Sequence, residues 1–259
     1  MTHYKLISWN VNGLRAIVKK DFWKILEELN PDVLALQETK SDDEIMKKFV
    51  VEHPDYKMYW HSNQIKKGYS GVATLTKIPV EDYCTGFKIE RFDQEGRVVK
   101  TKFKDFTFFN IYFPNGGQGP HRVDYKIEFY DACLAHMEEL RQKGEKVVIA
   151  GDFNTAHHEI DLHDPKGNQK TTGFLPIERA WLDKLVEHNY IDTYRYFHPD
   201  KADMYTWWDM RSFSRPKNKG WRIDYFFIAP ELKDNLKSAS ILTDVYGSDH
   251  CPLGIELEF

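Results

Sequence analysis

Val147-Val148-Ile149-Ala150-Gly151-Asp152-Phe153-Asn154 is an apolar run that breaks at a glycine into a carboxylate and a carboxamide. An apolar run without alternation indicates a strand that is buried on both faces. Open α/β sheets place their chemistry on loops at strand ends, which makes Asp152 and Asn154 candidate functional residues. Taken alone, the two residues fit a turn equally well, because Gly, Asp and Asn all suit tight turns.

The same pattern, an apolar strand followed by polar side chains, recurs in three other places. A single acidic residue after a strand more often caps or turns the chain, and His250 alone fits a hydrogen-bonded structural histidine. Several such groups at the ends of apolar strands instead indicate one convergent site. They are Asn10, Glu38, Tyr112, Asp152, Asn154, Asp224 and the pair Asp249-His250.

The composition is that of an ordinary globular protein, with 41% hydrophobic and 29% charged residues among 259. No linker or repeat divides the chain, which predicts one domain over residues 1–259. The net charge is −4, so any polyanion site must come from local clusters of Lys and Arg.

Three cysteines without a Cys-x-x-Cys pair favour free thiols in the cytosol. A signal core and a membrane-spanning run are both absent, which predicts a cytoplasmic protein without a membrane partner. We expect a monomer.

Apolar periodicity predicts alternating strands and helices. The expected helices cover 22–29, about 41–50 with a capping box of Ser41 and Glu44, about 122–142, and a segment that Pro176 starts. Besides the central strand, the expected strands are 6–9, 33–36, 56–61, 71–76, 98–103, 107–112, 223–229, 240–243 and 253–257. Two β-rich halves with intervening helices predict an α/β fold in which two packed sheets are covered by helices on the outside.

The polar groups at the strand ends suit phosphodiester chemistry. Glu38 with one neighbouring oxygen ligand suits Mg²⁺, which keeps most of its waters and bridges to a substrate phosphate. An aspartate can accept a proton from water, and an imidazole held by a second carboxylate can donate to a phosphoryl oxygen. Together these groups predict metal-assisted phosphodiester hydrolysis.

A second group of possible ligands comprises His157, His158, Asp161 and His163. These side chains can bind zinc, but their spacing lacks the tight pairs of helical zinc sites. The preferred interpretation is a hydrogen-bonded loop that supports the neighbouring Asp152.

Basic residues gather in loops that also contain Gly, Ser or Trp. Each group alone fits a solvated surface, but their position beside the polar strand ends favours a track for nucleic-acid phosphates. The groups are Arg15 with Lys19-Lys20, Lys66-Lys67, Lys166 with Lys170, and Arg211, Arg215, Lys217, Lys219 with Arg222.

Six blocks, in order along essentially the whole chain, resemble the signature blocks of the exonuclease III family of apurinic/apyrimidinic (AP) endonucleases. They run from Ile7 to Arg15, Leu36 to Lys40, Gly68 to Val72, Gly151 to Asn154, Gly220 to Tyr225 and Gly247 to Pro252. The resemblance implies a four-layered α/β sandwich, with two mainly antiparallel sheets packed face to face. It also implies Mg²⁺-dependent cleavage of duplex DNA 5′ to an abasic site, leaving a 3′-hydroxyl, with Mn²⁺ as a substitute. Exonuclease activity from 3′ to 5′ and cleaning of damaged 3′ ends are expected as well.

The resemblance also implies roles for individual residues. Glu38 would ligate the metal with Asn10 beside it, and Asp152, Asn154 and Asp249 would belong to the metal's surroundings. Asp152 would activate water, while Tyr112, Asn154 and His250 would hold the phosphate, with His250 oriented by Asp224. The residues expected to bind substrate are Trp207, Trp221 and Ile223 around the baseless sugar, and Arg15, Tyr69, Arg97, Asn115, Arg122 and Lys217 elsewhere.

Two positions depart from the mammalian branch of the family: Asn12 replaces an aspartate near the metal, and Gln118 replaces a loop arginine. The departures leave open a second metal position and the strength of product retention. Two other functions also stay open. One is a phosphomonoesterase of the same superfamily, since Gly-Asp-x-Asn and Ser-Asp-His alone mark that wider group. The other is a nucleic-acid-binding module without catalysis.

Overall fold

Two six-stranded sheets form the centre of the computed structural model, which describes residues 1–51 and 55–259. The first sheet has the strand order β13 (Leu236–Ile241), β14 (Leu253–Glu258), β1 (His3–Asn10), β2 (Val33–Gln37), β4 (Val72–Thr76) and β3 (Lys57–His61). The second has the order β5 (Asp82–Thr85), β6 (Val98–Lys102), β7 (Thr107–Tyr112), β8 (Val147–Asp152), β12 (Asp224–Ile228) and β9 (Ile191–Asp192).

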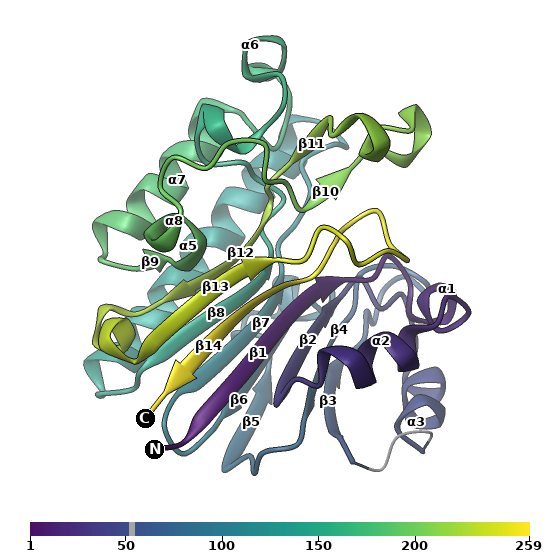
Figure 1. Cartoon of the computed structure of the whole chain (residues 1–259), viewed down its shortest axis with the longest axis vertical. Coiled ribbons are helices and arrows are strands. Elements are labelled where there is room, and N and C mark those ends of the chain that lie inside the picture. Colours follow the sequence, from purple (N-terminus) through teal and green to yellow (C-terminus); the bar gives the residue numbers. More distant parts are fainter. Residues whose placement is uncertain (52–54) are drawn as a thin grey trace.

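Each sheet is mixed and contains one parallel pair, β1 with β2 and β7 with β8, among antiparallel neighbours. The chain ends lie side by side at one end of the neighbouring strands β1 and β14 (Figure 1), where the Thr2 N–H donates to the Phe259 carbonyl at 2.7 Å.

The helices are α1 (Leu14–Val18), α2 (Phe22–Leu29), α3 (Asp43–Val51), α4 (Glu90–Asp93), α5 (Pro120–Gln142), α6 (Pro165–Asn168), α7 (Pro176–Glu187) and α8 (Thr193–Phe197). Most of them cover the outer faces of the sheets, whereas α6 lies beyond the sheets (Figure 1) and Tyr194 of α8 packs into the core between them. Short 3₁₀ turns lie at Glu159–Asp161, Met210–Ser212, Arg215–Lys217 and Pro230–Asn235, and a small hairpin joins β10 (Trp207–Trp208) to β11 (Gly220–Trp221). In Figure 1 the hairpin stands beyond the ends of β8 and β12.

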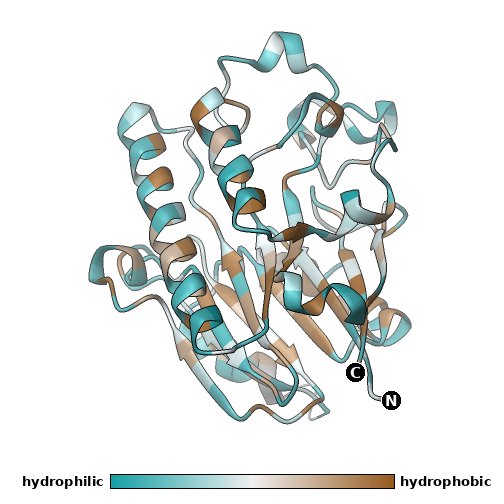
Figure 2. Cartoon of the chain, turned by 90° about the vertical axis from the view of Figure 1, so that its left-hand side faces the viewer, coloured by the Kyte–Doolittle hydropathy of each residue, from teal (hydrophilic) through white to brown (hydrophobic). Residues whose placement is uncertain are grey.

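Three buried clusters separate the layers. Leu6 and Ile255 of the first sheet pack with Phe108, Val148 and Phe226 of the second, which makes the core between the sheets. A second cluster joins the outer face of the second sheet to α5 and α7, and a third joins the first sheet to α1, α2 and α3. The strands are accordingly brown with apolar residues in Figure 2, whereas α5 and α7 alternate between apolar and polar positions. The layers are those of the expected four-layered α/β sandwich.

Strand register brings three predicted site residues to one level of the second sheet. Asp152 on β8 is paired with Tyr112 on β7 and with Asp224 on β12. The carboxyl ends of β1 and β2 open at the same end of the sandwich, where the hydrogen bonds of Asn10 link the two sheets. The polar residues of both sheets therefore meet at one end of the sandwich.

Several element boundaries differ from the sequence-based expectation. Ser41 is not the cap of α3, because its hydroxyl donates to the Thr39 carbonyl and the Asp42 carboxylate accepts from the Ile45 N–H. Strand β13 starts at Leu236, before the expected 240, and the exposed edge strand β5 was not foreseen. Of the described residues, no helix is both long and apolar enough to cross a membrane.

Candidate active site

A cavity of about 210 Å³ opens where the ends of the two sheets meet. Most of the sequence-predicted site residues line it directly, while Asn10 and Asp224 lie behind it, hydrogen-bonded to lining residues. The lining residues are Glu38, Tyr112, Asn115, Asp152, Asn154, Thr171, Thr172, Gly173, Trp207, Trp221, Ile223, Asp249 and His250.

Asn10 ties the two principal carboxylates together. Its amide nitrogen donates to Glu38 Oε1 at 3.0 Å and to Asp152 Oδ2 at 2.8 Å, while its Oδ1 accepts from the Asn12 N–H. Glu38 and Asn154 both adopt left-handed backbone conformations, with φ of 49° and 53°. Such conformations cost energy for a residue with a side chain and are found preferentially at functional sites.

Lys40 is an active-site residue to which the sequence analysis gave no role. Its ammonium lies 2.8 Å from Glu38 Oε2 and also donates to Asn12 Oδ1. Burial opposes ionisation of Glu38, but the charge of Lys40 and the hydrogen bonds from Lys40 and Asn10 outweigh it and hold the pKa of Glu38 below its usual value. The only sequence signal for a role of Lys40 was its position two residues after Glu38. The loop that follows a strand end brings neighbouring residues into the same site.

Asp152 is the most perturbed carboxyl group of the cavity. Burial and the negative charges of Asp224 and Glu38 raise the pKa of Asp152 to about 8, although His250 and the Asn154 N–H act in the opposite direction. The N–H donates to Asp152 Oδ1 at 2.8 Å. The site therefore holds more negative charge than its own cations balance.

His250 faces Asp152 from the other side and is held by Asp224. Its Nδ1 lies 2.8 Å from Asp224 Oδ2, and its Nε2 lies 4.0 Å from Asp152 Oδ2. Burial opposes a charge on the imidazole, but Asp224, Asp152 and Asp249 outweigh it and raise the pKa of His250 to about 10. The Thr206 hydroxyl, which the sequence analysis missed, donates to the same Asp224 oxygen at 2.6 Å.

Asn154 is positioned by hydrogen bonds on three sides. Its amide nitrogen donates to the Phe113 carbonyl at 3.0 Å, and its Oδ1 accepts from Asn115 Nδ2 at 2.9 Å. Its carbonyl accepts from the ammonium of Lys126 at 2.7 Å. Lys126 is fully buried, and its ammonium lies 2.7 Å from the carboxylate of Glu178. Lys126 was hidden from sequence analysis because it occupies the inner face of α5, where an apolar residue is expected.

Tyr112 contributes a neutral phenol. Burial and the charge of Glu38 raise the pKa of Tyr112 well above its usual value. Arg97 lies beneath it and donates to the Tyr112 carbonyl at 3.1 Å, to the Tyr69 hydroxyl at 3.3 Å and to Glu95 at 2.5 Å. Arg122 binds the same Glu95 through both terminal nitrogens, at 2.8 and 2.6 Å.

The burial of Arg97 corrects one sequence-based expectation. Its side chain is 0% exposed, so the guanidinium does not reach a DNA backbone at the surface and instead supports Tyr69 and Tyr112. Arg222 of the basic loop is likewise buried, between Asp161 and Asp192. Arg215 donates to the carbonyls of Thr243 and Val245 at 2.8 and 2.7 Å. Arg15 and Lys217 are exposed and lie outside the cavity.

Aromatic side chains form the apolar wall of the cavity. Trp207 and Trp221 meet edge to face with ring centroids 6.4 Å apart, and Trp221 also packs against Phe174. Ile223 belongs to the same cluster. Trp207 Nε1 donates to Asp249 Oδ2 at 3.1 Å, and Asp249 Oδ1 accepts from Asn12 Nδ2 at 2.9 Å. Asp249 therefore connects the apolar wall to the polar half of the site.

Glu38, Asp152 and His250 place one possible ligand atom each within 4.8 Å of one another. The raised pKa of His250 keeps its imidazole protonated and without a free lone pair, which leaves the two carboxylates as the ligands. Burial and neighbouring negative charges raise the pKa of Asp152, and a divalent cation beside Glu38 and Asp152 would offset this effect and favour the ionised carboxylates. The donor set thus fits a hard divalent cation.

The loop after β8 does not bring His157, His158, Asp161 and His163 together as ligands, and its side chains make hydrogen bonds and ion pairs instead. Asp161 is buried, 2.8 Å from Arg222 and 2.5 Å from Arg195, and these charges hold its pKa below the usual range against the effect of burial. His157 instead bonds to Asp183 of α7, at 2.9 Å.

Comparison with known proteins places this architecture in a family. Residues 7–250 match the model of the Endonuclease/Exonuclease/phosphatase family. The exodeoxyribonuclease of Bacillus subtilis (strain 168) is 42% identical over 250 residues, which cover 96% of this chain and 97% of that protein. The DNA repair nuclease APEX1 of Danio rerio is 40% identical over 98% of this chain and 82% of its own length.

Solved structures show the same fold. The AP endonuclease LMAP from Leishmania major superposes with a TM-score of 0.90 and 30% identity, over 99% of this chain and 88% of that chain. The catalytic domain of Xenopus laevis APE2 superposes with a TM-score of 0.87 and 31% identity, over 97% and 90% of the two chains. The chain therefore belongs to the endonuclease/exonuclease/phosphatase family, and within it to the DNA repair nucleases of the AP endonuclease and exodeoxyribonuclease group.

Proposed function

We propose that this protein hydrolyses the phosphodiester bond 5′ to an abasic site in duplex DNA and leaves a 3′-hydroxyl. We include 3′-to-5′ exonuclease and 3′-end-cleaning activity in the proposal, and we propose that residues 1–259 act as one domain and as a monomer. The observation that carries it is the position of Asp152. This carboxylate lies between Glu38 and the His250–Asp224 pair, at the floor of a cavity with one apolar wall.

Mg²⁺ is the proposed metal, with Mn²⁺ as a substitute, held by Glu38 and Asp152. When bound, the cation neutralises charge on the phosphate and on these carboxylates. Asn10 orients both carboxylates through its amide nitrogen. Asn154 and Asp249, also expected near the metal, have side-chain oxygens that already accept hydrogen bonds from Asn115, Asn12 and Trp207. We therefore assign these two residues to the surroundings of the ion.

The residues around the cavity divide the work of hydrolysis. Asp152, in its ionised form, takes a proton from the attacking water, whose oxygen then forms the new bond to phosphorus. The P–O3′ bond breaks, its electron pair leaves with O3′, and O3′ takes up a proton to become the 3′-hydroxyl. The protonated Nε2 of His250, the neutral phenol of Tyr112 and the amide of Asn154 donate hydrogen bonds to the phosphoryl oxygens, where charge develops.

The apolar wall suits a sugar that carries no base. Ligand pockets for drug-sized molecules begin at about 300 Å³, and this cavity of about 210 Å³ is smaller. Trp207, Trp221 and Ile223 line it on one side. Extruding a nucleotide from the duplex costs a few kcal/mol and costs least where pairing and stacking are already lost. An abasic site therefore suits this protein in two ways. It costs the least to extrude from the duplex, and its sugar without a base is small enough for the cavity.

Exposed cations outside the cavity are proposed to hold the DNA backbone. Arg15 and Lys217 are free of ion pairs in the part of the chain that the structure describes. Tyr69, proposed for the same role, is half-buried, and its hydroxyl accepts from Arg97 at 3.3 Å. Arg122 binds Glu95 and supports the same tyrosine network from the side. Duplex DNA with abasic sites or damaged 3′ ends is the proposed partner.

The alternative is a phosphomonoesterase, and one solved relative, 27% identical, is a Neisseria 3′ phosphatase bound to a product DNA hairpin. The tryptophan wall favours a sugar-phosphate of DNA over a small soluble phosphomonoester.

Two substrates test the proposal: a duplex with one abasic-site analogue and a small phosphomonoester, each incubated with Mg²⁺ or with EDTA. We expect incision only with Mg²⁺ and little release of phosphate. Binding without incision would leave a DNA-binding module, and faster hydrolysis of the phosphomonoester would select the alternative. Light scattering of the purified protein tests the monomer.

A further inference from the structure

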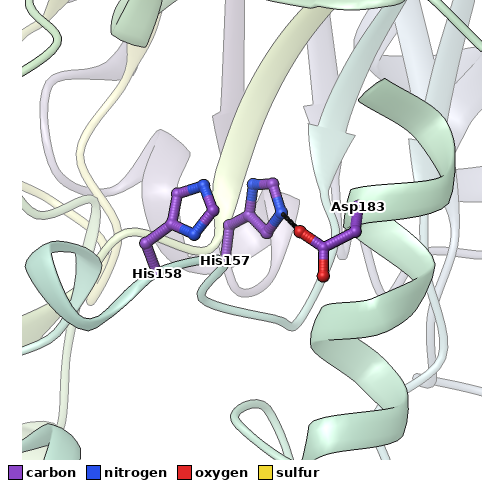
Figure 3. A group of neighbouring side chains, drawn as sticks. All are labelled: His157, His158 and Asp183. Carbon is purple, nitrogen blue, oxygen red and sulfur yellow. Dashed lines mark hydrogen bonds and ion pairs between the residues drawn. The ribbon is translucent and has the colours of Figure 1, made fainter. Parts of the chain in front are cut away.

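Two histidines and an aspartate form a second cluster, outside the active site (Figure 3). His157 and His158 follow β8 and stack with ring centroids 3.7 Å apart and an angle of 24° between the rings. Asp183 projects from α7 and its Oδ1 lies 2.9 Å from His157 Nε2. One ligand atom from each of the three residues lies within 4.8 Å of the other two. We propose that His157, His158 and Asp183 bind a divalent transition-metal ion of the zinc type.

His157 is the fixed member of this cluster. Its backbone N–H donates to the Tyr225 hydroxyl at 3.1 Å, and its carbonyl accepts from Arg179 Nε at 2.8 Å. The side chain is only 4% exposed, so the imidazole has little room to turn. Asp183 is 58% exposed and His158 lies at the surface, which leaves both free to adjust around an ion. The three residues also line one surface pocket.

The donor types select the class of ion. Two imidazoles and one carboxylate suit Zn²⁺ and its transition-metal neighbours, whereas Mg²⁺ requires oxygen ligands. The ion replaces the hydrogen between His157 Nε2 and Asp183 Oδ1, and that proton leaves to solvent. Two ligand atoms on a tetrahedral zinc ion lie about 3.4 Å apart, whereas His157 Nε2 and Asp183 Oδ1 are 2.9 Å apart. Binding therefore requires Asp183 to move away from His157 by roughly half an ångström. The His158 ring turns out of the stack to direct its lone pair at the ion, and water fills the fourth position.

A bound ion links the loop that leaves β8, which borders the active site, to a helix of the outer layer. His157 lies three residues after Asn154, on the loop that leaves β8, while Asp183 is carried by a helix of the outer layer. Binding to the folded chain alone stabilises it, so the melting temperature should rise with the concentration of Zn²⁺. The cation proposed for the active site would be held by Glu38 and Asp152 and by neither of these histidines.

The test uses the full chain, freed of metal by a chelator and titrated with Co²⁺ as a visible probe for the zinc type of site. Glu38→Gln with Asp152→Asn removes both carboxylates of the active-site group and serves as the background. In that background we expect one Co²⁺ per chain with the intense visible absorption of a low-coordinate ion. His158→Ala and Asp183→Asn should each weaken binding by about tenfold or more, because losing even an outer-shell partner costs about 10- to 100-fold.

His163→Ala is the matched control, since this exposed histidine lies in the same loop and outside the cluster. It should bind Co²⁺ as the background does. His158→Ala and Asp183→Asn in the otherwise native chain should keep full Mg²⁺-dependent incision, which shows that they fold. Absence of Co²⁺ binding in the background would overturn the proposal, and so would equal binding by the His158→Ala and His163→Ala proteins.

Discussion

His250 Nδ1 lies 2.8 Å from Asp224 Oδ2, and this contact decides the charge of the imidazole that faces the cavity. Both side chains are almost fully buried, at 4% and 1% exposure. A buried imidazole prefers to be neutral, and only the adjacent carboxylates raise its pKa, from 6.5 to about 10. The pair therefore keeps a proton on His250 throughout the neutral pH range.

Asp224→Asn should remove the main support for that proton. We expect the pKa of His250, measured by NMR titration of the imidazole, to fall toward its ordinary value of about 6.5, with a loss of incision of about 10- to 100-fold. Because the folded-state pKa is raised, the stabilisation is complete below about pH 6.5 and is lost as the pH rises toward about 10. The gap in melting temperature between wild type and variant should shrink over that window. Asp244→Asn, on the exposed loop before His250, should change none of these quantities.

Glu38→Gln keeps the shape of the side chain and removes one negative ligand. Incision should fall by about two orders of magnitude or more and should require far more Mg²⁺. Incision rate measured against Mg²⁺ concentration shows the shift, and Glu44→Gln on the exposed side of α3 is the control. An unchanged metal dependence would exclude Glu38 as a ligand.

Lys217→Ala should weaken DNA binding through charge alone. In a plot of the logarithm of affinity for duplex DNA against the logarithm of salt concentration, each phosphate contact contributes about −0.9 to the slope. The slope of this variant should therefore be shallower by roughly the contribution of one contact. Turnover of bound substrate should stay largely intact. An affinity that does not respond to salt would contradict a phosphate track.

Arg97→Lys should affect turnover and leave DNA binding unchanged, which is the reverse of the effect expected for Lys217→Ala. The buried guanidinium holds the Tyr112 carbonyl, the Tyr69 hydroxyl and Glu95 at once, and a lysine ammonium lacks the planar fork to reach all three. We expect turnover to fall while the salt dependence of binding stays as in the wild type. A flattened salt slope with normal turnover would show that Arg97 contacts phosphate after all.

Trp221→Ala tests the apolar wall. Trp221 is partly exposed toward the cavity, and its loss should reduce the ratio of abasic to undamaged cleavage. Trp181→Ala is the matched comparison, because Trp181 is 4% exposed in the core between the second sheet and its helices. That change should cost about 3 to 5 kcal/mol of stability and leave the ratio unaltered. A large drop in melting temperature with an unchanged ratio in Trp221→Ala would remove Trp221 from the site.

Local sequence patterns were sufficient to locate the polar residues that meet at the cavity. Apolar runs such as 147–150 end in polar residues, and short-range periodicity alone identifies both the strand and its end. The α/β layering follows from the same periodicity, because strands and helices with one apolar face must pack in layers. The resemblance of six short blocks then supplied the family, which the comparisons confirmed.

Contacts between residues far apart in the chain were beyond those patterns. Sequence periodicity does not set the register that places Tyr112 and Asp224 on either side of Asp152. It also did not show that Arg97 is buried, because an arginine in a loop usually lies at the surface and only its pairing with Glu95 makes burial tolerable. Asp183 was not recognised as a partner of His157 for the same reason. Their partnership depends on how α7 packs against the loop after β8, and such packing is decided by the whole core.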